Sequence, residues 1–104
     1  MELTRNADKV LCYIYKIFLT RKRQGKSQHE SKKFSDDFYK SDSDLSSWHE
    51  SDIGDALMEL GRNGYLKIYI VGDFELTDQS IVYMENRFKN GLKELAAFIS
   101  QFVP

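Results

Sequence analysis

The fold is decided by residues 57–76, LMELGRNGYLKIYIVGDFEL, in which the spacing of the apolar residues changes from helical to extended. Up to Leu60 the apolar residues recur every three or four positions, which is the spacing of a helix. The pair Asn63-Gly64 that follows is of the type that ends helices in the left-handed conformation. Beyond the pair the pattern alternates, with Leu66, Ile68 and Ile70 against Tyr65, Lys67 and Tyr69. Gly72-Asp73 suits a two-residue turn, so the sequence predicts a β-hairpin over 65–76.

Helices are predicted on both sides of this hairpin. Ser47-Trp48-His49-Glu50 fits a capping box, in which the serine hydroxyl accepts from the third helical amide and the glutamate returns to the cap amide. A helix is therefore expected over about 48–63. After the hairpin, Thr77 suits the cap of a helix over about 78–90, and a last helix is expected over about 91–103.

The amino-terminal third adds two more helices to the prediction. Apolar residues at helical spacing predict an amphipathic helix over about 4–23, and Phe34 and Phe38, four residues apart, predict a short helix near 31–40. The residues expected in the core are Val10, Leu11, Ile14, Phe18, Phe34, Phe38, Ile53, Leu57, Leu60, Leu66, Ile68, Leu76, Ile81 and Met84. The expected fold class is α+β, a helical bundle with a small antiparallel hairpin and an extra carboxy-terminal helix.

Length and composition exclude several classes of protein. The 104 residues are enough for one domain with a real core, and 41% hydrophobic residues exceed what a disordered chain carries. The longest uncharged apolar stretch, 95–103, is too short for a membrane span, which needs about 20 residues. Charged residues interrupt the apolar part of the first 20 residues, and Cys12 is the single cysteine. We therefore expect a cytoplasmic protein without a secretory leader or a disulfide.

The net charge of −1 conceals a strong segregation of charge along the chain. Residues 1–33 carry nine basic and three acidic groups, residues 34–60 carry one and eight, and residues 61–104 carry five of each. Such a distribution indicates either two faces that meet different partners or two halves that attract each other across the fold.

The order helix, short helix, helix, hairpin, helix resembles that of a winged-helix domain. Residues 57–66 resemble the junction of that family, in which a leucine on the third helix is followed by polar residues and Gly-Tyr-Leu, and residues 74–85 resemble its return through leucine, threonine and Tyr-Met-Glu. Among winged helices the chain is most similar to the small YjcQ-like group of bacterial and phage proteins. The resemblance covers about 53–88, and it implies that the third helix and the hairpin, or wing, address DNA.

The resemblance therefore directs attention to basic residues near those elements. The side of the third helix opposite its apolar stripe carries Ser51, Asp55, Met58, Glu59 and Arg62, with Asp52 at its edge. These carboxylates repel phosphates, and the wing has only Lys67 as a cation. The candidate DNA-binding residues are Arg21, Lys22, Arg23, Lys26, Ser51, Arg62 and Lys67. The basic stretch at 21–33 either follows a phosphate backbone or lies solvated over acidic neighbours such as Asp36, Asp37, Asp42 and Asp44.

The last helix carries apolar residues most of the way round, more than one buried face requires. They are covered either within the chain or by a second copy of it. The candidate homodimer interface consists of Leu95, Phe98, Ile99 and Phe102.

Sequence patterns of catalysis and cofactor binding are missing. His29, His49 and Cys12 do not have the spacing of metal ligands, and Asp42-x-Asp44 lacks the later ligands of a calcium loop. We expect no enzyme, no cofactor and no small-molecule substrate. Two functions stay open: a DNA-binding transcriptional regulator, and a protein-interaction module on the same frame without affinity for DNA.

Overall fold

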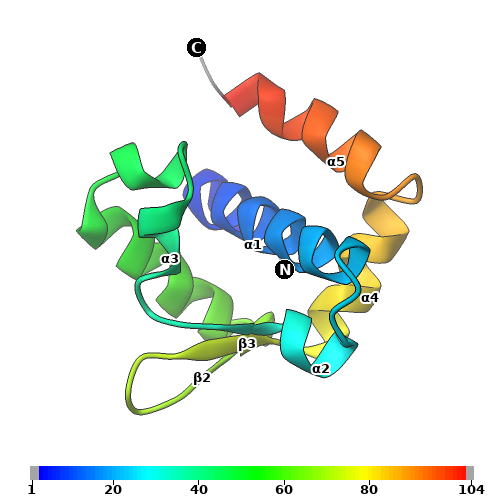
Figure 1. Ribbon diagram of the computed structural model, residues 1–104. Coiled ribbons are helices and arrows are strands. Elements are labelled where there is room, and N and C mark those ends of the chain that lie inside the picture. The colour runs from blue at the N-terminus through cyan, green and yellow to red at the C-terminus, as the bar shows by residue number, and fades with distance from the viewer. Residues whose placement is uncertain (1–2, 103–104) are drawn as a thin grey trace.

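The longest helix, α1 (Arg5–Arg23), runs through the centre of the molecule, and the other elements are arranged around it (Figure 1). The computed structural model describes residues 3–102. After α1 come α2 (Gln28–Ser31), β1 (Lys33–Phe34) and two 3-10 turns, η1 (Phe38–Ser41) and η2 (Leu45–Ser47). The chain continues through α3 (Glu50–Arg62), β2 (Leu66–Ile68), β3 (Phe74–Leu76), α4 (Asp78–Arg87), α5 (Leu92–Ile99) and η3 (Ser100–Phe102). The fold is α+β.

The three strands form one antiparallel sheet in the order β1-β3-β2. Phe34 lies opposite Phe74, and Phe74 lies opposite Ile68, so this row faces the helices. The rings of Phe34 and Phe74 stack with their centroids 5.3 Å apart. The sheet thereby joins the segment after α2 to the hairpin about 40 residues later.

The expected short helix over 31–40 is wrong. Its first part forms β1, and the carbonyl of Lys32 accepts from the amide of Leu76 at 2.9 Å. Phe38 does lie in a helical turn, η1, but Asp36 and Asp37 before it form a turn that the Phe38 amide closes by donating to the Ser35 carbonyl. Pairing with β3 therefore overrides the spacing of the two phenylalanines.

Two further local predictions are corrected. Ser47 does not cap α3: its hydroxyl donates to the carbonyl of Asp44 at 2.8 Å inside η2, and α3 begins at Glu50 after a His49 cap without a side-chain bond. The hairpin turn is longer than two residues, because the amide of Tyr69 donates to the carbonyl of Asp73 at 2.8 Å. Gly72, with φ +96°, closes this three-residue loop in the left-handed conformation.

The core lies where α1 meets α3, α5 and the inner face of the sheet. Twelve of the fourteen residues expected there are buried, and two are not. Leu57 is only partly buried and Ile68 is 37% exposed. The core also takes in Leu45, Phe74, Phe88 and the ring of Tyr13, which lie outside the predicted set. No helix within residues 3–102 has both the length and the apolar character that crossing a bilayer requires.

Candidate nucleic-acid interface

The outer face of the sheet is basic. Lys33 and Lys67 lie on either side of Glu75, in register across the three strands. The ammonium of Lys32 lies 3.7 Å from the same carboxylate, and the hydroxyl of Tyr69 donates to it. The Tyr69 hydrogen bond, assisted by the three lysines, holds the pKa of Glu75 below its usual value. One carboxylate thus neutralises part of a surface that carries three ammonium groups.

The end of α1 and the turn after it supply more exposed cations. Lys22, Arg23 and Lys26 are exposed, and Lys22 donates to the side-chain oxygen of Gln28 at 2.8 Å. Cations at this position also complement the carboxy-terminal end of the α1 dipole.

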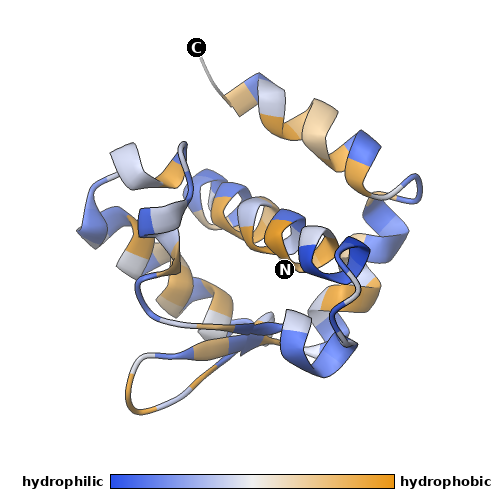
Figure 2. Cartoon of the chain, viewed as in Figure 1, coloured by the Kyte–Doolittle hydropathy of each residue, from blue (hydrophilic) through white to orange (hydrophobic). Residues whose placement is uncertain are grey.

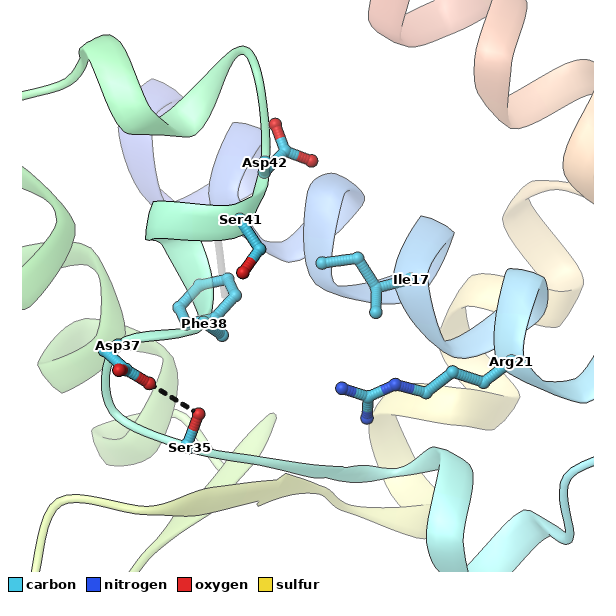
Figure 3. Close-up of a pocket in the computed structure, with 7 residues that line it drawn as sticks. All are labelled: Ile17, Arg21, Ser35, Asp37, Phe38, Ser41 and Asp42. Atoms are coloured by element: carbon cyan, nitrogen blue, oxygen red, sulfur yellow. Dashed lines mark hydrogen bonds between the residues drawn. The ribbon is translucent and has the colours of Figure 1, made fainter.

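Arg21, by contrast, is used largely inside the chain. Its guanidinium donates to the carbonyls of Ser31, at 3.2 Å, and Lys33, and it lies 4.4 Å from the centroid of the Phe34 ring. It projects toward a pocket of about 320 Å³ that Ile17 and Phe38 also line (Figure 3). Arg21 therefore fixes α1 to β1, and its candidate role as a DNA contact stays a prediction.

This bond network brings the two basic regions together at one end of the molecule. Because Arg21 bonds to the Lys33 carbonyl, the end of α1 lies next to the strand whose side chain begins the outer row of the sheet. The same end holds α2 and the sheet in Figure 1, and Figure 2 shows that α2 and the turn before it are strongly hydrophilic. We call the set Lys22, Arg23, Lys26, Lys32, Lys33 and Lys67 the basic end.

The exposed face of α3 is acidic. Ser51 and Arg62 are exposed on it, as expected, but Asp55 lies between them along the same side. The Glu59 carboxylate accepts from the amide and the hydroxyl of Thr4, each at 2.7 Å. These bonds fix the start of α1 to α3, and they lower the pKa of Glu59. A groove of about 430 Å³ along this contact is lined by Asp52 and Asp55.

No ion pair within residues 3–102 joins the basic stretch to the acidic segment that follows it. Within residues 3–102 the ion pairs are Lys32 with Glu75 and Arg87 with Asp8. Neither pair involves the carboxylates before and between η1 and η2 that were considered as neighbours of the basic stretch, Asp36, Asp37, Asp42 and Asp44. Arg21 nevertheless lines one pocket together with Asp37 and Asp42 (Figure 3), so the basic stretch and the acidic segment meet there, and both interpretations of the charge distribution stay open.

The residues of the candidate dimer interface are largely covered within the chain. Leu95 and Ile99 are buried where α5 packs on α1. Phe98 and Phe102 are partly buried and lie edge to face with their ring centroids 5.2 Å apart, and the Arg87 guanidinium lies 5.0 Å from the Phe98 ring. Leu95 and Ile99 are thus not available to a second chain in this fold, and the homodimer stays a prediction.

Sequence reasoning missed the most exposed apolar residues within 3–102. Ile70 is fully exposed and Val71 is 75% exposed at the tip of the hairpin. The pattern that could have found them is the uninterrupted run Tyr69-Ile70-Val71, which continues past the residue where alternation with polar side chains ends.

Within residues 3–102 no three His, Cys, Asp or Glu side chains are grouped so as to hold a metal ion. Cys12 is buried in α1, and burial raises the pKa of its thiol to about 12.

Comparison with protein-family models, with curated proteins and with solved structures finds no match to the chain. What the protein does is therefore inferred from its own residues and their arrangement.

Proposed function

We propose that the chain is a DNA-binding regulator on a winged-helix frame, and that it holds the phosphate backbone of a duplex with its basic end. The observation that carries the proposal is the group of six lysine and arginine side chains around the sheet and the end of α1. The acidic residues of α2 and the sheet are Glu30 and Glu75, so the cations of this region outnumber its carboxylates. A duplex strand carries a phosphate about every 3.4 Å, so several of these cations reach phosphates at once.

The arrangement of elements supports the winged-helix part of the proposal. Three helices, α1, α2 and α3, precede a hairpin, and a short strand after α2 completes an antiparallel sheet with the hairpin strands. In this frame α3 is the element expected to read bases. Its carboxylates Asp52 and Asp55 disfavour that role here, so the proposal assigns binding to the wing sheet and the α1 end.

The chemistry of these side chains indicates what kind of DNA binding results. Lysine makes point contacts with phosphates and reads no base by them. Binding is therefore expected to depend little on sequence and strongly on salt, since each phosphate contact releases counterions. If the protein makes five phosphate contacts, raising the salt from 50 to 200 mM lowers the affinity about 500-fold.

Fluorescence anisotropy with a labelled random duplex tests the proposal. The Lys33→Ala/Lys67→Ala variant and the Lys22→Ala/Lys26→Ala variant should each weaken binding and reduce the slope of log affinity against log salt by about two. The control is Lys89→Ala/Lys93→Ala, which removes two exposed cations from the loop after α4 and the start of α5. This control should bind as the wild type does.

Two outcomes would overturn the proposal. One is absence of binding at 50 mM salt. The other is an Arg62→Ala variant that loses binding while both lysine variants keep it, since that result would place the contact on α3.

A further inference from the structure

Arg21 and Arg87 are the partly buried arginines within residues 3–102, and they differ in their partners. Arg87 donates to both carboxylate oxygens of Asp8, at 2.6 and 2.9 Å, and these bonds raise the pKa of Arg87. Arg21 has two carbonyls and the Phe34 ring beside it, but no carboxylate of the described residues forms an ion pair with it. Burial lowers the pKa of Arg21. A guanidinium that is partly removed from water and has no counter-ion attracts an anion strongly, because less water screens it.

The free part of the Arg21 guanidinium faces a pocket. Both of its bonds to carbonyls are made by Nη1, so Nε and Nη2 have no acceptor within residues 3–102. Figure 3 shows the guanidinium projecting into the pocket of about 320 Å³ that lies between α1 and residues 35–42. Ligand sites in proteins have volumes of roughly 300 to 1,000 Å³, so this pocket suits a small molecule. Such a molecule would supply the anion that Arg21 lacks.

Two carboxylates at the same pocket restrict the charge of the ligand. Asp37 accepts from the Ser35 hydroxyl at 2.8 Å through Oδ1, and its Oδ2 atom has no donor within residues 3–102. Asp42 is already engaged, because it accepts from the amides of Asp44 and Leu45 at 2.9 and 3.0 Å. A ligand with negative charge alone, such as inorganic phosphate, is repelled by both carboxylates. A ligand that carries an ammonium group beside its anion meets an opposite charge on each side.

The rest of the lining is mainly apolar. Ile17 on α1 and Phe38 on η1 line the pocket, and both side chains pack against the core. An aliphatic group of the ligand would be stabilised there by about 25 cal/mol for each Å² of apolar surface it buries. One carboxylate, one ammonium group and an aliphatic side chain together describe a free α-amino acid such as valine.

We propose that this pocket binds a free α-amino acid with an aliphatic side chain. The carboxylate of the ligand accepts from Nε and Nη2 of Arg21, which suits the planar fork of a guanidinium. Its ammonium group donates to Asp37, and its side chain packs on Ile17 and Phe38. Because no ion pair joins Arg21 to Asp37, the ligand lies between these two groups. The site uses none of the six cations of the basic end, so it does not depend on the proposed DNA binding.

NMR titration of the isotope-labelled protein with L-valine tests the proposal. The expected result is saturable shift changes in residues 17–42, with a dissociation constant of about 1 mM or less. Isovalerate, which is valine without its amine, and isobutylamine, which is valine without its carboxylate, are the matched ligands. Each should bind about tenfold or more weakly than L-valine, because each leaves one charged group of the pocket without its partner.

Variants of the two charged contacts test the assignment of each residue. Asp37→Asn should weaken the binding of L-valine about fivefold or more and should not weaken that of isovalerate, since only the ammonium group needs the charge of Asp37. Arg21→Gln should abolish saturable binding of both ligands. The matched controls are Asp36→Asn and Arg5→Gln, because both residues are exposed and lie outside the lining of the pocket. Both controls should bind L-valine as the wild type does.

Three outcomes would overturn the proposal. The first is that L-valine causes no saturable shift changes up to about 10 mM. The second is that inorganic phosphate binds at these residues and L-valine does not. The third is that Asp37→Asn weakens L-valine and isovalerate equally. Circular dichroism checks that the variants fold, and the comparison of the three ligands on the wild type decides the matter even if Arg21→Gln does not fold.

Discussion

Leu57 and Leu60 lie three positions apart on α3, yet they differ in how much they contribute to the core. Leu60 is fully buried, whereas Leu57 is only partly buried. We expect Leu60→Ala to lower the free energy of unfolding by about 2–5 kcal/mol, because it removes buried surface and leaves a cavity. Leu57→Ala should cost clearly less. Urea denaturation measures both, and equal losses would contradict the difference in burial.

Glu59 gives the stability of the protein a dependence on pH. Because Thr4 donates two hydrogen bonds to the carboxylate, its pKa in the folded chain is below that in the unfolded chain. The unfolded chain therefore binds the proton first as the pH falls, and the stabilisation present at neutral pH is lost below about pH 4.5. Glu59→Gln should be less stable at pH 7 and should lose less stability between pH 5 and 3.

Urea denaturation at a series of pH values checks the Glu59 prediction. Glu85→Gln, the same chemical change on the exposed side of α4, is the control and should keep the acid dependence of the wild type. If Glu59→Gln and the wild type have parallel curves, the bonds from Thr4 do not stabilise the charged form in solution.

At the scale of elements, two glycines should respond to alanine in opposite directions. Gly72 has φ +96°, and a Cβ there would lie 3.2 Å from the Cβ of Asp36, so Gly72→Ala should cost about 1–2 kcal/mol. Gly54 lies inside α3 with open space around the added atom, so Gly54→Ala should stabilise by about 0.5–1 kcal/mol. Thermal unfolding of the two variants checks the signs, and a neutral Gly72→Ala would mean that the loop can change its conformation at little cost.

The same elements show how far sequence patterns lead. The helix α1, the Thr77 cap of α4 and the change of period after Asn63 are local features, and each was predicted within a few residues. The strand β1 was not predicted, because two residues are too few to show the alternation of apolar and polar side chains that marks a strand. It exists through Phe74 and Glu75, which are about 40 residues away in the sequence. Local patterns cannot contain such a pairing.

For the candidate site, the sequence showed which charged residues are present but not where they lie in the fold. The cations of the basic end could be counted from the sequence, but the use of Arg21 between α1 and β1 depends on tertiary contacts. The resemblance to winged helices pointed to α3, whose exposed side was already recognised as acidic. The apolar tip was read as part of an alternating strand, and only the observed loop places Ile70 outside it.

The molecule as a whole is nearly neutral but strongly asymmetric. Its net charge is −1, while six of its fifteen Lys and Arg residues form the basic end and eight of its sixteen Asp and Glu residues lie within 34–60, around η1, η2 and α3. This separation gives the molecule an electric dipole moment, and in the proposed DNA binding the dipole would turn the basic end toward the polyanion before contact is made. In dilute buffer the opposite poles of neighbouring molecules attract each other. Moderate salt shortens the Debye length to about 10 Å and screens that attraction. The solubility of the protein should thus rise with added salt at low ionic strength.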